Sequence, residues 1–165
     1  MAATTKIITV AEVEDNALKT ATFDDALLED FILPAQRHYL RPFLGNDFYT
    51  DILAQVAGDS SYTSDNSTLV EDWIKPMLSY YIVYDAFPSI RINITSKGVM
   101  INQSETSVSA SNSEAANLRQ HYLSMAERWQ KDVKQYIYDQ QDLDSSKYSD
   151  FEPKTDFNNK GMFIV

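Results

Sequence analysis

Apolar residues recur with two different periods along this chain, and each period predicts a different kind of element. Steps of three and four residues run through 22–44, 46–56, 67–87 and 111–138, which is the pattern of helices that bury one face. Between Ile90 and Ile94 apolar and polar residues alternate one by one, as in a strand. The sequence therefore predicts an all-α fold, a helical bundle of about four helices with a small β-hairpin inserted between the last two long helices and an extended C-terminal tail.

Polar residues and glycines mark the expected ends of the first two helices. Thr22 can cap the first helix, and Gly45 is expected to end it as a left-handed C-terminal residue. Asn46 or Asp47 is expected to cap the second helix, and Gly58 to close it.

The last two long helices carry similar signals. Ser67 or Thr68 is expected to start the third helix, which is apolar on more than one side and is therefore expected at the centre of the bundle. Ser111 and Glu114 fit a capping box that opens the fourth helix, which runs to about Tyr138.

Three places in the helical pattern are less regular. Lys6–Val13 is a short apolar run that fits either an edge strand or an extended arm packed on the body. Pro34 and Pro76 lie inside helical runs, and proline has no N–H for the helical hydrogen bond. We therefore expect either a kink at each proline or a restart of the helix, at Pro34 for the first and near Trp73 for the second.

The predicted hairpin at about 89–103 is the first candidate functional element. Ser96-Lys97-Gly98 supplies its turn, because glycine readily adopts a positive φ. A lone hairpin of this size is marginally stable in water, so a neighbouring subunit or a ligand is expected to stabilise it. The residues expected to contact a neighbour or line a channel are Arg91, Ile92, Asn93, Ile94, Thr95, Ser96, Lys97, Gly98, Val99, Met100 and Ile101.

The end of the chain is the second candidate element. Residues 1–140 form the expected helical domain, and 141–165 an extended tail that is acidic at first and apolar at its end. Such an apolar end could add to the sheet edge of a partner. The alternative is that it folds back on its own body. The residues expected to dock are Phe157, Gly161, Met162, Phe163, Ile164 and Val165.

Charge and composition exclude several classes of protein. The 165 residues carry a net charge of −10, which argues against a sequence-specific DNA-binding protein. Residues 12–30 contain seven acids and one base, Lys19, and so have a net charge of −6. The predicted hairpin contains Arg91 and Lys97 but no acid, so its net charge is +2. This asymmetry fits either ordinary solvated faces or a basic hairpin that meets an acidic face of another copy. No signal peptide and no membrane-spanning run are predicted, so we expect a soluble protein made in a cytoplasm.

No catalytic or metal-binding pattern is present, and we expect neither an enzyme nor a cofactor. The chain has no cysteine, four glycines and no nucleophile elbow or phosphate-binding loop. Its two histidines, His38 and His121, lie on different predicted helices, and His38 is expected to be a partly buried packing residue.

Residues 32–49, with the sequence ILPAQRHYLRPFLGNDFY, resemble the opening helix pair of small phage proteins common in viruses of Bacteroidetes. These are similar to the head-to-tail connector (adaptor) proteins of tailed bacteriophages, with the ring proteins of crAss-like phages as candidate kin. The resemblance continues in Met77–Phe87, in Lys97-Gly98, in 117–137 and in the closing Asn159-Lys160-Gly161, and so covers most of the chain.

The resemblance implies a structural virion protein of the neck between capsid and tail. Copies, typically twelve, would form a ring below the portal protein, through which genomic DNA passes without sequence-specific contacts. The hairpin at 91–101 would face the channel or a neighbouring subunit, and the tail at 157–165 would reach the portal or an adjoining neck or tail protein. A membrane is not among the implied partners.

Two other functions stay open at this point. One is a neck stopper or tail-completion protein, which would bind the adaptor ring and close the channel. The other is a monomeric helical binding module whose acidic surface mimics DNA.

Overall fold

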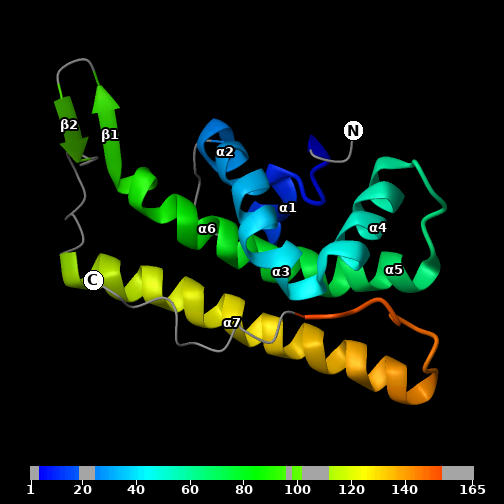
Figure 1. Ribbon diagram of the computed structural model, residues 1–165. Helices are drawn as coiled ribbons and strands as arrows, with labels where there is room; N and C mark the ends of the chain where they lie inside the picture. The colour runs from blue at the N-terminus through cyan, green and yellow to red at the C-terminus, as the bar shows by residue number, and fades with distance from the viewer. Residues whose placement is uncertain (1–3, 19–24, 96–97, 102–111, 154–165) are drawn as a thin grey trace.

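The structure, a computed structural model, describes residues 4–18, 25–95, 98–101 and 112–153 (Figure 1). In these ranges the chain is mainly helical, which confirms the predicted all-α class. The elements are α1 (Val10–Ala17), α2 (Asp25–Ala35), η2 (Gln36–Leu40), α3 (Arg41–Leu44), α4 (Asn46–Ala57), α5 (Ser64–Thr68), η3 (Leu69–Ile74), α6 (Lys75–Arg91), β1 (Ile92–Thr95), β2 (Gly98–Ile101) and α7 (Asn112–Leu143). The segments η2 and η3 are π-helical.

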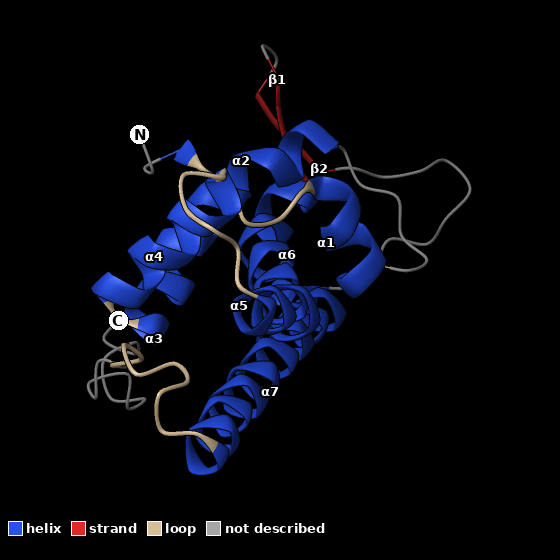
Figure 2. Cartoon of the chain, turned by 90° about the vertical axis from the view of Figure 1, so that its right-hand side faces the viewer, coloured by secondary structure: helices blue, strands red, loops and turns tan. Residues whose placement is uncertain are grey.

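Helix α6 forms the centre of the bundle, as its apolar pattern predicts. It packs against α1 and α2 on one side and against α7 on the other, and Figures 1 and 2 show the two groups separated by α6. Most of its apolar side chains are buried, among them Met77, Leu78, Ile82, Val83 and Ala86.

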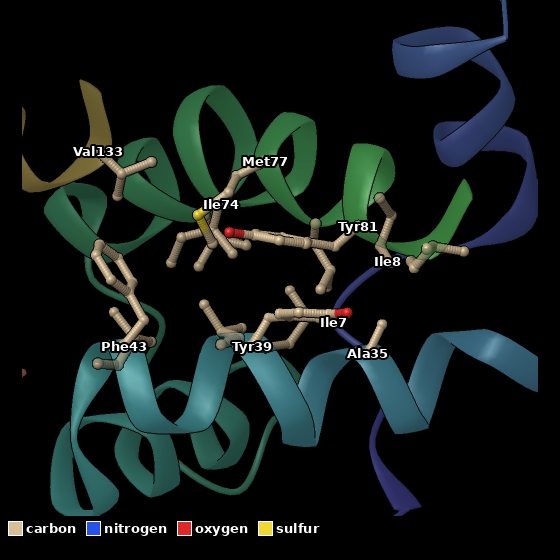
Figure 3. Packing of buried hydrophobic residues seen from close by; sticks show 14 of the residues in the cluster. Ile7, Ile8, Ala35, Tyr39, Phe43, Ile74, Met77, Tyr81 and Val133 are labelled. Atoms are coloured by element: carbon tan, nitrogen blue, oxygen red, sulfur yellow. The ribbon is translucent and has the colours of Figure 1, made fainter. Parts of the chain in front are cut away.

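The N-terminal segment is an arm followed by a helix, so the edge-strand prediction for Lys6–Val13 is wrong. Ile7 and Ile8 are buried in the core (Figure 3). The buried amide of Gln36 accepts a hydrogen bond from the backbone N–H of Ile7. Helix α1 then starts at Val10, because Thr9 and the third residue of the helix form a capping box.

Gly45 and Gly58 differ from one another, although both have a positive φ. Gly58 has φ 79° and ψ 11°, the left-handed conformation that is expected after a helix. Gly45 has φ 86° and ψ 160°, so its predicted left-handed conformation is wrong. That extended geometry leads the chain directly into α4, which begins at Asn46 without a side-chain cap.

The third long helix starts earlier than predicted. Thr63 is its N-cap and accepts a hydrogen bond from the backbone N–H of Asn66, so the predicted start at Ser67 or Thr68 is wrong. The predicted caps at Thr22 and Ser111 lie outside the described residues.

Prolines lie inside both continuous helices, 25–44 and 64–91, which do not restart. Each π-helical segment ends two residues before a proline. The backbone N–H of Arg41 bonds to the carbonyl of Gln36 just before Pro42, and that of Lys75 bonds to Val70 just before Pro76. These hydrogen bonds span five residues, as in a π-helix, and they pair backbone groups next to the proline, which has no N–H to donate. Of the two alternatives at each proline, a kink or a restart, the restart at Pro34 or near Trp73 is therefore wrong.

Helix α7 runs to Leu143, beyond the predicted end at Tyr138. Val133 and Ile137 are fully buried on the side that packs along α6, as predicted, whereas Leu118 is 46% exposed. No helix in the described ranges is both long and apolar enough to cross a membrane.

Candidate functional site

The predicted hairpin residues lie at the end of α6 and on the two strands. They are found at the end of α6 (Arg91), in β1 (Ile92, Asn93, Ile94 and Thr95) and in β2 (Gly98, Val99, Met100 and Ile101). The expected turn residues Ser96 and Lys97 lie outside the described residues. The predicted strand start at Ile90 is wrong, because α6 continues through Ile90 and Arg91.

The register of the two antiparallel strands gives the β element two unlike faces. Residues directly opposite one another share a face of the sheet. One face carries Ile92 with Ile101 and Ile94 with Val99. The other carries Asn93 with Met100 and Thr95 with Gly98. The first, which we call the aliphatic face, therefore combines four aliphatic positions contributed by both strands.

The strands extend from the end of α6, on the side away from α7 (Figures 1 and 2). They lie mainly against one another, and β1 also lies against the end of α6 from which it emerges. Within the described residues the sheet has only these two strands, so each keeps one edge without a strand partner. Such an edge can pair with the strand of another chain.

Arg119 of α7 supports the last turns of α6, from which the strands project. Pro88 has no N–H, so the carbonyl of Tyr84, four residues earlier, lacks its helical donor. The Nε of Arg119 donates to that carbonyl at 3.4 Å, and its guanidinium lies 4.3 Å from the centroid of the Tyr84 ring. The helix can therefore continue past Pro88 to Arg91.

A second contact joins this part of α6 to η2. The ring of Tyr39 stacks on Tyr81 with a centroid distance of 3.9 Å (Figure 3), and its hydroxyl donates to Asp85 Oδ1 at 2.8 Å. Burial raises the pKa of the Asp85 carboxyl, although the hydrogen bond from Tyr39 and the charges of His38 and Arg119 oppose this. Burial, followed by the negative charge of Asp85, also raises the pKa of the Tyr39 hydroxyl. The part of α6 that leads into β1 is therefore held by contacts from two sides.

After α7 the chain turns back toward α3, in a segment that we call the strap, residues 144–153 (Figures 1 and 2). Tyr148 is buried, and its hydroxyl donates to the carbonyl of Asp65 at 2.8 Å. Lys147 forms an ion pair with the Asp65 carboxylate at 3.0 Å. The Phe151 ring lies 5.6 Å from that of Phe43. The strap is therefore part of the folded body.

Gly45 allows the strap to approach α3 closely. A Cβ at position 45 would lie 2.7 Å from the backbone oxygen of Glu152, which is closer than real Cβ atoms come. The candidate docking residues beyond the strap lie outside the described residues: Phe157, Gly161, Met162, Phe163, Ile164 and Val165.

The described residues contain no group of three or more His, Asp or Glu side chains that could hold a metal ion. His38 packs edge-on against Tyr39 but is exposed, so its predicted partial burial is wrong. His121 on α7 is exposed as well.

Two of the structural contacts had partial signals in the sequence. Pro88 inside a helix predicts an unpaired carbonyl at Tyr84, but nothing in the sequence identifies Arg119 as its partner. Thr9 and Glu12 have the spacing of a capping box, which could have located α1.

The chain matches no curated protein and no solved structure. Residues 40–160 match a protein family described as a family of unknown function, DUF6712. The match covers all of α3 to α7, including the β element and the strap. The chain therefore belongs to the DUF6712 family of unknown function.

Proposed function

We propose that this chain is a structural virion protein, a head-to-tail connector (adaptor) that forms a ring below the portal of a tailed bacteriophage. In this proposal the helical bundle forms the body of each subunit. The β element contacts the neighbouring subunit or faces the channel, and the tail at 157–165 docks on the portal or on an adjoining neck protein.

The observation that carries the proposal is the aliphatic face of the two strands. Ile92, Ile94, Val99 and Ile101 share this face by register, on an element that projects from the bundle. A two-stranded sheet gains little stability alone in water, and covering four aliphatic positions would stabilise it. A neighbouring subunit in a ring provides such a surface at every copy.

The attachment of the strands supports the same role. Arg119 joins the C-terminal part of α6 to α7, and Tyr39 joins it to η2. The strands therefore begin at a part of α6 that is fixed to its neighbours. A braced base lowers the entropy that is lost when a projecting element binds a partner.

The net charge of −10 supports passage of DNA through such a ring. A channel with negative walls repels phosphates and releases few counterions, so DNA would move through it without being retained. The protein would be made in the cytoplasm of the host bacterium and would act in the neck of the virion.

Native mass spectrometry tests the proposal. The purified chain is measured alone and after mixing with the portal protein encoded in the same genome. A complex that contains portal and this chain in equal numbers is the expected result. A chain that ignores the portal but binds a preformed adaptor ring would instead be a stopper or completion protein. A chain that binds neither would overturn a role in the neck.

A further inference from the structure

The outer face of α7 carries a group of bases on an otherwise acidic chain. Arg128, Lys131 and Lys134 are all exposed and follow one another at three-residue steps, so they share one broad face of the helix. We call these three residues the basic stripe. Glu127, which is half-buried, and the exposed Asp132 flank it, and the three bases outnumber them.

The basic stripe has no ion-pair partner in the part of the chain that the structure describes. The bases in the four ion pairs among the described residues are Lys6, Lys75 and Lys147. The Nζ of Lys134 lies 5.6 Å from the centroid of the Tyr138 ring. The positive charge on α7 is therefore available to an acidic partner.

Exposed acids on α1 and in the first two turns of α2 carry the opposite charge, and we call these residues the acidic α1–α2 surface. Asp15, Asp25 and Asp30 are exposed and have no ion-pair partner among the described residues. Glu29 is excluded from this group because Lys6 already pairs with it.

The two charged surfaces lie on opposite sides of the molecule. Helices α1 and α2 pack on one side of α6 and α7 packs on the other (Figures 1 and 2). The basic stripe therefore cannot reach the acidic surface of its own chain. In a two-fold dimer built on α7, bases would meet bases. A head-to-tail contact brings unlike charges together at every step, and it closes into a ring when the rotation between copies allows.

From this arrangement we infer that the basic stripe on α7 binds the acidic α1–α2 surface of a second copy, and that this contact joins neighbouring subunits of the ring. The inference deepens the proposed function and rests on it for the closed ring. The head-to-tail contact itself requires no portal.

Charge-swapped variants of the full chain test this contact. The first variant, Arg128→Glu with Lys131→Glu, has two acidic surfaces. The second, Asp25→Lys with Asp30→Lys, has two basic ones. A third carries all four substitutions. All four positions are exposed, so each variant is expected to keep the helical circular dichroism of the wild type.

Association is measured by sedimentation velocity and native mass spectrometry at low ionic strength, without portal. The wild type and the fourfold variant are expected to associate. Each two-residue variant alone is expected to associate at least about tenfold more weakly, because like charges face one another. An equimolar mixture of the two is expected to recover association, with the two chains in equal numbers.

Three results would overturn the inference: a wild type that stays monomeric, two-residue variants that associate like the wild type, or a mixture that does not recover. Portal binding is scored separately by adding portal to the wild type. If the mixture recovers association but the wild type does not bind portal, the connector function is contradicted and the head-to-tail contact is still supported.

Discussion

The guanidinium of Arg119 lies over the ring of Tyr84 and donates to the Tyr84 carbonyl that Pro88 leaves without a helical donor. One side chain from α7 thus supports the point at which α6 continues past a proline. The first strand, β1, begins four residues after that proline, so the contact bears on the site as well as on the fold.

Replacing Arg119 by Met is expected to lower the free energy of unfolding by about 1–2 kcal/mol, from the lost hydrogen bond and the lost cation–π contact. Urea unfolding followed by circular dichroism measures this. Gln120→Met is the control, because Gln120 lies on the same helix, its side chain is exposed and it is not part of the basic stripe. In a Pro88→Ala background, the new N–H can bond to Tyr84, so Arg119→Met should cost less there. An equal cost in both backgrounds would contradict the capping role.

Asp85 is expected to make stability depend on pH. Burial raises its pKa above the ordinary 3.8, so the folded chain holds this proton more tightly than the unfolded chain does. The contribution of Asp85 to the free energy of unfolding therefore falls as the pH rises from its pKa in the unfolded chain to its higher pKa in the folded chain. Asp85→Asn keeps an acceptor for Tyr39 without the charge. Its stability relative to the wild type should therefore be higher at pH 7 than at about pH 3.5. Urea unfolding across this range tests it, with Asp132→Asn as the exposed control.

Gly45→Ala is expected to destabilise the protein by more than about 2 kcal/mol. Alanine rarely adopts φ 86° with ψ 160°, and its Cβ would meet the oxygen of Glu152 in the strap. Gly58→Ala is the matched control, because Gly58 also has a positive φ but has no atom within 4 Å of the added Cβ. Its cost should stay near 1 kcal/mol. Thermal unfolding compares the two, and equal costs would show that the strap contact contributes nothing.

Polar substitutions on the aliphatic face are expected to abolish ring assembly without loss of helix. Ile94→Ser with Val99→Ser alters one cross-strand pair of that face, whereas Met100→Ser lies on the opposite face by register. Native mass spectrometry with portal should show loss of the complex only for the first variant. Assembly by both variants would argue against the aliphatic face as a contact surface.

Deletion of Gly161–Val165 is expected to leave the helical content intact and to abolish binding to the portal. The physical reason is that an apolar chain end gains its free energy from the surface on which it docks. Circular dichroism and portal pull-down are the two measurements. Loss of folding in the deleted chain would show instead that this end belongs to the core.

Local signals predicted much of the helical structure because they act over a few residues. Gly58 closes α4, and Val133 and Ile137 face the core, as helical spacing requires. The start of the third long helix was missed, because Thr63, Ser67 and Thr68 are all adequate caps. Contacts with α4 favour the earlier start, because Gln55 Oε1 accepts hydrogen bonds from the backbone N–H of Thr63 and from the side-chain amide of Asn66. The early start of α1 was missed although its capping box is visible in the sequence.

The sequence by itself determined the all-α class and the central place of the third long helix, since both follow from the period of apolar residues. Tertiary structure alone decided three other features. It placed Arg119 at Tyr84, the strap residue Tyr148 at Asp65, and the basic stripe on the side opposite α1 and α2. These partners are separated by 35 or more residues in the chain. No local propensity specifies such contacts, because they form only when the whole core has assembled.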